Sequence, residues 1–207
     1  MYTGITRGLF EVTRVERAPD LLVYEVDLGA ELSAGLEPGA SVSIDGVCQT
    51  VVRLDGTRVT IEAIRESLER TTLGELAVGA RVSVERSARV GDELGGHDVA
   101  GHVIGTGEIV EVRREGNDVG LAIAVPATWM RYILPKGFVA VDGSSLTVGE
   151  VDPAGRFRIH LIPETLRRTR IGAKRVGERV NIELDPRTVA IVDTVERVLA
   201  ERAAAGS

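Results

Sequence analysis

Residues 39–56 read GASVSIDGVCQTVVRLDG, and residues 137–155 read GFVAVDGSSLTVGEVDPAG. The two stretches align at an offset of 97 residues, which places Cys48 on Ser145. Each contains runs of β-forming residues on both sides of an Asp-Gly pair. Asp-Gly between such runs is typical of a β-hairpin turn, because glycine readily adopts a positive φ. The chain therefore contains the same predicted hairpin twice.

The similarity continues on both sides of the two hairpins. Residues 58–85 align with residues 156–183 at an offset of 98, and Gly4 aligns with Gly101 at an offset of 97. Three collinear blocks at nearly the same offset indicate an internal duplication. The predicted domains are residues 1–97 with a joining segment at 88–97, residues 98–186, and a tail at 187–207.

Short runs of β-forming residues fill each repeat. In the first repeat they lie at residues 21–28, 41–44, 47–54, 58–63 and 81–85. Five or six short strands in so short a segment predict a small closed antiparallel barrel, because closure removes exposed strand edges. The predicted fold class is therefore all-β, with two β-barrels in tandem.

One long helix and three short ones are also predicted. The short helices are expected at residues 66–73, 126–134 and 164–170. Pro126 would occupy a first helical position, where the missing amide donor is harmless. The long helix is expected to begin at Asp185-Pro186 and to run to Ala203 with a broad apolar stripe. It has no counterpart in the first repeat, and it either packs on its own barrel or joins subunits.

Composition excludes several classes of protein. The 207 residues carry a net charge of −6 and are 43% apolar, which is typical of a packed acidic protein and unsuited to nucleic-acid binding. The single cysteine, Cys48, excludes an intrachain disulfide and a multi-cysteine zinc site. No signal-peptide pattern or membrane-spanning apolar run is visible. We therefore expect a cytoplasmic protein with no membrane or nucleic-acid partner.

A set of motifs distributed over residues 1 to about 200 resembles the α-subunit-type riboflavin synthase family. The motifs are MYTGI (1–5), DGVCQTV (45–51), GGH (95–97), GHV (101–103), KGF (136–138), DGSSLTV (142–148), LIPETL (161–166) and NIE (181–183). The resemblance implies two six-stranded Greek-key β-barrels and a C-terminal α-helix. It also implies a homotrimer with active sites between neighbouring subunits, and lumazine synthase as a further partner.

The implied reaction is a dismutation of two 6,7-dimethyl-8-ribityllumazine molecules. One molecule transfers a four-carbon unit to the other, which gives riboflavin and 5-amino-6-(D-ribitylamino)uracil. The resemblance implies no cofactor and no metal. A duplicated barrel suits this reaction because two related, diverged pockets can each hold one copy of the substrate.

The resemblance implies four catalytic residues. Cys48 and Ser145 would supply a nucleophile or polar activation, with water as an alternative nucleophile. His102 would transfer protons, because histidine titrates near neutral pH. Thr147 would donate hydrogen bonds, as would its repeat counterpart Thr50.

The implied substrate-binding residues come from matching segments of the two repeats. They are Gly4, Ile5, Thr6, Ser41, Cys48, Gln49, Thr50, Glu62, Ala63, Ile64, Arg65, Glu66, Ser67, Gly101, His102, Val103, Lys136, Ser145, Leu146, Thr147, Ile162, Pro163, Glu164, Thr165, Leu166 and Arg167. Their hydroxyl and backbone groups would contact the pyrimidine edge and the ribityl chain of the ligand.

Other interpretations remain open. A lone cysteine is often a buried small hydrophobe, and we interpret His97 and His160 as structural. A non-catalytic lumazine or flavin carrier of the antenna type would share the two barrels. An oligonucleotide-binding barrel would need surface aromatics and a basic groove, and neither is visible.

The sequence departs from the family pattern at four positions near the predicted pockets. They are Tyr2, Gln49, Pro135 and Ser144. Tyr2 replaces the usual phenylalanine, so its added hydroxyl must find a hydrogen-bond partner. Ser144 replaces an aliphatic residue beside Ser145.

Overall fold

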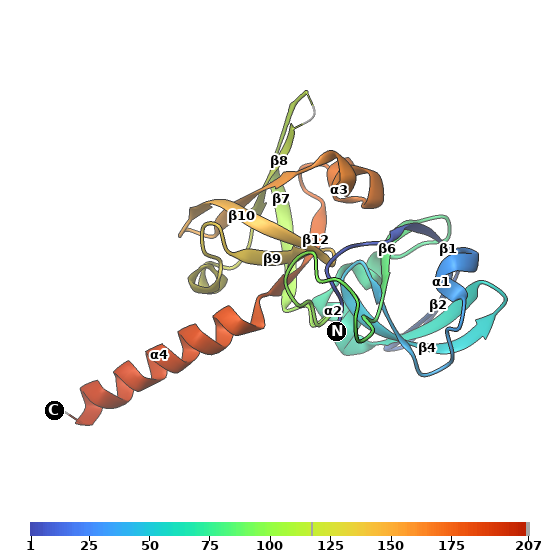
Figure 1. Ribbon diagram of the computed structural model, residues 1–207, viewed down its shortest axis with the longest axis horizontal. Helices are drawn as coiled ribbons and strands as arrows, with labels where there is room; N and C mark the ends of the chain where they lie inside the picture. Colours follow the sequence, from blue (N-terminus) through green and yellow to red (C-terminus); the bar gives the residue numbers. More distant parts are fainter. Residues whose placement is uncertain (117, 206–207) are drawn as a thin grey trace.

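The computed structural model describes residues 1–116 and 118–205 and contains two closed antiparallel barrels (Figure 1). The first barrel comprises β1 (Gly8–Ala18), β2 (Leu21–Asp27), β3 (Ser41–Ile44), β4 (Val47–Asp55), β5 (Arg58–Ile64) and β6 (Arg81–Arg86). The second comprises β7 (Gly105–Glu115), β8 (Asp118–Ala124), β9 (Phe138–Val141), β10 (Ser144–Asp152), β11 (Arg156–Leu161) and β12 (Arg179–Leu184). The predicted all-β fold of two six-stranded barrels is confirmed.

The two barrels share one topology. Around the first barrel the strand order is β1-β2-β5-β4-β3-β6, and the second repeats it with β7-β8-β11-β10-β9-β12. In each barrel an Asp-Gly pair joins the third strand to the fourth. Asp45 and Gly46 have φ values of 44° and 83°, and Asp142 and Gly143 have 43° and 81°. Two successive positive φ angles are the geometry that a tight hairpin turn requires.

Side chains that alternate inward and outward along each strand give each barrel its core. On β11, Phe157, Ile159 and Leu161 point inward and are buried, whereas Arg156 and His160 point outward. The first core consists mostly of Val, Leu and Ile, with Tyr24 as its largest buried side chain on the strands. The scarcity of aromatic residues is therefore compatible with two well-filled barrels.

The short helical segments differ from their prediction. They are α1 (Gly29–Ser33), α2 (Arg65–Arg70), α3 (Pro163–Arg168) and the 3₁₀ turns η1 (Thr72–Glu75), η2 (Ala127–Tyr132) and η3 (Ile171–Ala173). The helices predicted at 66–73 and 164–170 end early, because Thr71 and Thr169 adopt extended conformations. The segment predicted as an α-helix at 126–134 is the 3₁₀ helix η2, and Pro126, with ψ of 130°, is its N-cap and not its first helical residue.

The terminal helix α4 (Pro186–Ala205) begins where the sequence predicts. The Asp185 carboxylate accepts hydrogen bonds from the Thr188 amide at 3.3 Å and from its hydroxyl at 2.7 Å, which caps the helix. Figure 1 shows α4 extending away from both barrels. Val189 and Val192 pack against the second barrel, so the first turns dock on the chain's own barrel.

The rest of the apolar stripe on α4 is uncovered. Ile191, Val195 and Leu199 are 64%, 52% and 60% exposed, and they lie on one face of the helix. The alternative that the helix packs on its own barrel is therefore confirmed for the first turns of α4, and a role in joining subunits stays a prediction for this exposed face.

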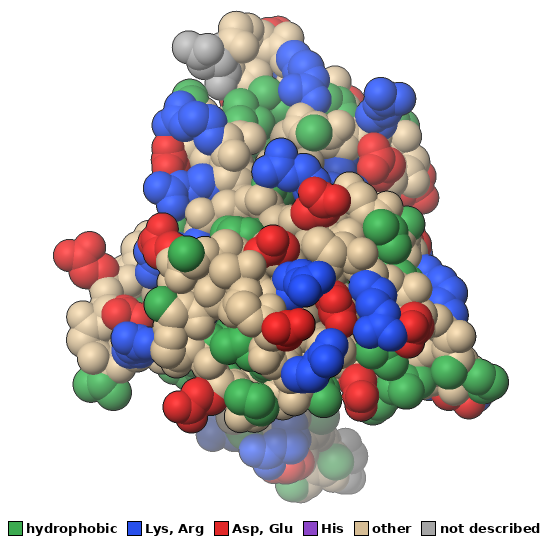
Figure 2. All heavy atoms as spheres, turned by 90° about the vertical axis from the view of Figure 1, so that its right-hand side faces the viewer, with side chains coloured by type: hydrophobic (Ala, Val, Ile, Leu, Met, Phe, Trp, Pro, Cys, Tyr) green, Lys and Arg blue, Asp and Glu red, His purple; other side chains and the backbone are tan. Residues whose placement is uncertain are grey.

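The barrels pack together through their equivalent turns. Gly46 lies so close to Gly143 that a Cβ on Gly46 would approach the Gly143 nitrogen to 2.3 Å. Asn181 on β12 donates to the Asp45 carbonyl at 2.7 Å and accepts from the Thr72 amide at 2.8 Å. Across the barrel face in Figure 2, positive and negative side chains are interspersed, with no broad basic groove.

Candidate functional site

The segment that precedes each barrel lies against the other barrel. The Ser145 amide on β10 donates to the Gly4 carbonyl at 2.9 Å, and the Cys48 amide on β4 donates to the Gly101 carbonyl at 2.9 Å. We call residues 1–7 and 98–104 the crossing segments. Each predicted pocket is therefore built from both repeats.

Two buried glutamates at equivalent positions hold these segments. Glu85 on β6 accepts hydrogen bonds from the Thr3 amide at 2.6 Å and from its hydroxyl at 2.7 Å. Glu183 on β12 accepts from the amides of Ala100 and Gly101 at 2.7 and 2.9 Å. Burial raises the pKa of both carboxyl groups, although the donated N–H groups oppose that rise.

The first crossing segment and the second barrel enclose a small cavity of about 110 Å³. It is lined by Gly4, Ile5, Thr6, Ser144, Ser145, Leu146, Ile162, Glu164, Thr165, Arg168 and Thr169. Eight of these eleven residues belong to the predicted binding set. The structure thus brings together residues that are more than 130 positions apart in the chain.

Ser145 is hydrogen-bonded to His97 beside this cavity. The Ser145 Oγ lies 2.7 Å from His97 Nδ1 and accepts from the His97 amide at 3.1 Å. The Ser145 hydroxyl donates to Nδ1 in the tautomer that carries its proton on Nε2, and it accepts from Nδ1–H in the other tautomer. Within the described residues, His97 Nε2 is buried with no hydrogen-bond partner. The His97 ring also stacks on Phe138, with centroids 5.2 Å apart.

Burial lowers the pKa of His97, so the imidazole is neutral at pH 7. In the tautomer with Nδ1 unprotonated, a neutral imidazole at this distance can accept the Ser145 proton, which is what a general base does. The sequence interpretation treated His97 as structural and did not predict this contact with Ser145. The available signal was the position of His97 in the joining segment, directly before the second crossing segment.

The equivalent position in the first barrel has different chemistry. Cys48 is half-buried, and its Sγ accepts a hydrogen bond from the Tyr2 hydroxyl at 3.2 Å. Burial and the neighbouring thiol raise the pKa of Tyr2, so the phenol stays protonated as a donor. The partner that the sequence required for this hydroxyl is therefore Cys48.

Gln49 turns inward from the first pocket. Its Nε2 donates to the Cys48 carbonyl at 2.8 Å, and its Oε1 accepts from the Tyr24 hydroxyl at 3.4 Å. The side chain is only 6% exposed. Gln49 is therefore a satisfied polar group at the barrel core.

Several predicted residues form an open rim. In the first repeat Thr50 and Glu62 are exposed on β4 and β5, and His102 is exposed in its crossing segment. Ile64 and its counterpart Ile162 are 59% and 63% exposed at the ends of equivalent strands. These groups face solvent in the single chain.

The other predicted residues lie around the same two sites. Ser41 is on β3, Arg65, Glu66 and Ser67 are on α2, Pro163, Leu166 and Arg167 are on α3, Thr147 is exposed on β10, and Lys136 is exposed in the turn before β9. Val103 is half-buried in the second crossing segment, whereas Ala63 faces the core and is 1% exposed. Ala63 can therefore contribute only its backbone to a ligand.

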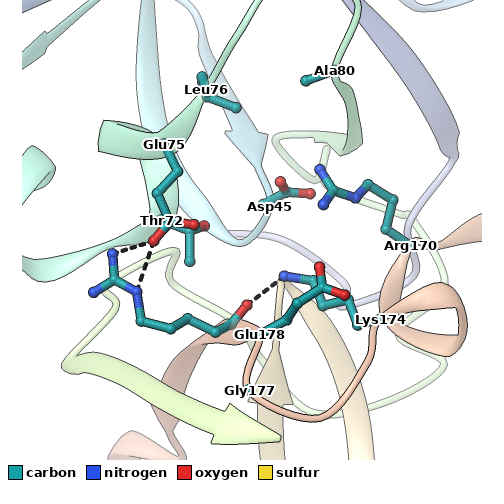
Figure 3. A pocket seen from close by; sticks show the side chains of 10 residues that line it. Asp45, Thr72, Glu75, Leu76, Ala80, Arg170, Lys174, Gly177 and Glu178 are labelled. Atoms are coloured by element: carbon teal, nitrogen blue, oxygen red, sulfur yellow. Dashed lines mark hydrogen bonds and ion pairs between the residues drawn. The ribbon is translucent and has the colours of Figure 1, made fainter.

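A larger cleft of about 480 Å³ separates the two barrels (Figure 3). Its charged groups mostly pair with one another: Arg179 binds Glu75, and Lys174 Nζ lies 3.2 Å from the Asp142 carboxylate. Figure 3 shows the Arg170 side chain reaching toward Asp45. Burial, together with the nearby Asp142, raises the pKa of Asp45 to about 7. We interpret this cleft as part of the inter-barrel interface.

The described residues were compared with two further kinds of feature, a metal site and a membrane-spanning helix, and match neither. Among residues 1–116 and 118–205, no group of three or more His, Cys, Asp or Glu side chains is arranged to hold a metal ion. Within the same residues, no helix combines the length and hydropathy needed to cross a membrane.

Comparison with known proteins identifies the family. The family described as lumazine binding domain matches residues 3–87 and again residues 100–185. Riboflavin synthase from Escherichia coli (strain K12) is 47% identical over 203 residues, which cover 98% of this chain and 95% of that protein. The chain belongs to the riboflavin synthase family. Riboflavin synthase from Chlamydia trachomatis serovar D is 38% identical over 202 residues, with 98% of each chain covered.

A solved structure also has this fold. LumP complexed with riboflavin has a TM-score of 0.82 and 23% identity, and the match covers 89% of this chain and 99% of that one. That likeness shows the fold alone. The much higher identity to riboflavin synthases over nearly the whole chain places this protein with the enzymes of the family.

Proposed function

We propose that this protein converts two molecules of 6,7-dimethyl-8-ribityllumazine into riboflavin and 5-amino-6-(D-ribitylamino)uracil. The observation that carries the proposal is the pair of equivalent strand positions with diverged polar groups, Cys48 on β4 and the Ser145–His97 pair at β10, each covered by the crossing segment of the other repeat. One substrate binds in each pocket, with its pyrimidine edge against backbone and hydroxyl groups. Much of the rate enhancement then comes from holding two identical ligands close together in the orientation that the reaction requires.

Ser145 acts as the nucleophile in the second pocket. Its oxygen adds to C7 of the bound lumazine, its proton passes to His97 Nδ1, and the negative charge moves into the pyrimidine ring. The short Oγ–Nδ1 distance and the neutral imidazole support this step. Donors around the pyrimidine edge stabilise the charge, as in other sites that bind developing anions.

The lumazine in the first pocket loses a proton from its acidic C7 methyl group. His102 is exposed in the second crossing segment and directly follows Gly101, whose carbonyl accepts a hydrogen bond from the Cys48 amide. It accepts the methyl proton in our proposal. Thr50 and Thr147 donate hydrogen bonds to the ligands from equivalent positions on β4 and β10.

We further propose a homotrimer in which a pocket of one subunit faces a pocket of its neighbour. The open rims at Ile64 and Ile162 and the uncovered stripe on α4 support this assembly, since both are apolar surfaces without a partner in the single chain. A cytoplasmic location and an association with lumazine synthase belong to the same proposal.

The decisive experiment is incubation of the purified protein with the lumazine alone. Riboflavin should accumulate, measured by chromatography, at half the rate at which lumazine disappears. Tight lumazine binding without new flavin would instead support a carrier of the antenna type. The Ser145→Ala variant serves as the matched control for contaminating activity.

A further inference from the structure

The two pockets differ at a second pair of equivalent positions. In the second pocket Thr6 Oγ1 and Ser144 Oγ lie 3.1 Å apart, and both residues line the cavity next to Ser145. Their side chains are buried, with 5% and 4% exposure. The repeat counterparts are Val103 and Val47, so the equivalent positions of the first site carry two isopropyl groups where the second site carries two hydroxyls.

The Thr6–Ser144 pair has one more hydrogen-bond donor than its contacts in the described part of the chain use. Two hydroxyls carry two donors, and the contact between them uses one. The described part of the chain provides no other hydrogen-bond partner for either oxygen. One O–H of the Thr6–Ser144 pair is therefore available to donate into the cavity that both residues line. Leaving such a buried donor unpaired would cost about 1–3 kcal/mol.

We propose that the Thr6–Ser144 pair determines the specificity of the second pocket by donating a hydrogen bond to an acceptor on the bound heterocycle. The ligand class is a flat heteroaromatic with a carbonyl oxygen or ring nitrogen at that edge. The identity of the heterocycle as a lumazine or flavin rests on the proposed function. The hydrogen-bond account rests only on the pair itself.

The consequence is a difference in affinity between two otherwise similar pockets. A ligand in the second pocket gains a hydrogen bond that the valines of the first cannot supply, so the second pocket is the tighter one. Thr6 reaches this pocket through the first crossing segment, so the first repeat sets the polarity of the second barrel's site.

The inference can be tested with riboflavin as a probe that does not turn over. Riboflavin fluorescence titrations of the wild type should show two classes of site. The double variant Thr6→Val with Ser144→Ala should weaken the tighter class by about fivefold to tenfold, because a net hydrogen bond contributes about 1 kcal/mol. The weaker class should keep its affinity. Thr6→Ser, which retains the donor, should bind like the wild type.

The reciprocal graft provides the matched control. Val47→Ser with Val103→Thr should strengthen the weaker class of site. If the double variant has a wild-type circular dichroism spectrum and both binding constants are unchanged, the inference is overturned. If the double variant does not fold, the double variant Thr6→Ala with Ser144→Ala, which also removes both donors, decides by the same criterion.

The binding assay also separates this inference from the proposed function. A change in the tighter class alone supports the specificity role even where the lumazine assay yields no riboflavin. Normal riboflavin formation with unchanged binding constants in the variant rejects the specificity role and leaves the proposed reaction intact.

Discussion

The hydroxyl of Tyr2 donates a hydrogen bond to Cys48 Sγ across 3.2 Å. Tyr2 is 1% exposed, and its backbone pairs with Val99 through hydrogen bonds of 2.7 and 3.1 Å. The second residue of the chain thus forms part of the wall behind the first pocket. Loss of this residue should damage a ligand site even if both barrels keep their strands.

Substitutions at Tyr2 should distinguish the contribution of its hydroxyl to stability from that of its ring. Tyr2→Phe keeps the ring and loses only the weak bond to sulfur, so the free energy of unfolding should fall by about 1 kcal/mol or less. Tyr2→Ala leaves a cavity among buried side chains and should cost about 3–5 kcal/mol. Urea denaturation measures both. A larger loss for Tyr2→Phe than for Tyr2→Ala would contradict this account.

Ser145 and His97 should act as a unit in catalysis. Ser145→Ala and His97→Gln should each lower kcat by about 100-fold or more, because general base catalysis of a nucleophile typically contributes that much. The double variant should be little slower than either single variant, because one function is lost in all three. Steady-state kinetics on the lumazine gives these values.

A matched histidine provides the control for the preceding prediction. His160 is exposed on β11 and contacts Asp118, so His160→Gln should leave kcat unchanged. Thermal unfolding of His97→Gln should also be recorded. Equal losses of kcat and melting temperature across the series would indicate a purely structural role for the Ser145–His97 contact.

Asp45 should make stability depend on pH. Its pKa is raised to about 7 in the folded protein, so the folded state keeps a proton that the unfolded chain releases. The stabilisation is present in acid and is lost as the pH rises through about 7. Relative to wild type, Asp45→Asn should gain up to about 1.4 kcal/mol per pH unit over the range from about 5 to 7. Denaturation at several pH values measures the difference.

The neighbouring Asp142 provides a control whose substitution should change stability in the opposite direction. Asp142→Asn removes the carboxylate that pairs with the buried Lys174, and it should destabilise the protein throughout the same pH range. If Asp45→Asn and Asp142→Asn had the same sign at pH 8, the assignment of the raised pKa to Asp45 would be rejected.

Gly46 should be intolerant of any side chain. A Cβ there would lie 2.3 Å from the Gly143 nitrogen at a φ of +83°, so Gly46→Ala should cost about 3 kcal/mol or more. Gly56 has a φ of +62° with nothing within 4 Å of its Cβ position. Gly56→Ala should therefore cost only about 1–2 kcal/mol. Equal costs in urea denaturation would show that contact between the barrels is unimportant.

The uncovered face of α4 should control assembly. Val195→Asp with Leu199→Asp should convert the trimer into monomers in light scattering, because charges on a buried apolar interface are strongly unfavourable. Ala200→Asp, on the opposite face of the helix, should leave the trimer intact. A monomeric wild type, or a trimeric double variant, would reject the assembly proposed for α4.

The sequence predicted local structure well wherever the determining residues are neighbours. The Asp-Gly pairs fix the hairpin between the third and fourth strands of each barrel, and Asp185-Pro186 starts α4 where expected. The α-helix predicted at 126–134 was wrong, because the apolar pattern there does not distinguish an α-helix from the shorter 3₁₀ helix η2.

The site was predictable only in part. The repeat alignment placed Cys48 and Ser145 in equivalent positions, but it gave no sign that Ser145 pairs with Gly4, since that contact joins distant segments. His97 was missed for the same reason. Its contact with Ser145 depends on how the joining segment packs against β10, and it has no counterpart in the first repeat.

The exchange of crossing segments also bears on how such a chain arose. A barrel standing alone would have no partner for the strand edge at Cys48 or Ser145, since the polypeptide that covers each edge enters from the other half. In a single-barrel ancestor, two molecules would have covered the same edges by exchanging their N-terminal segments. Gene fusion would then have captured an intertwined dimer in one polypeptide, and cutting the present chain at the junction should not release two working halves.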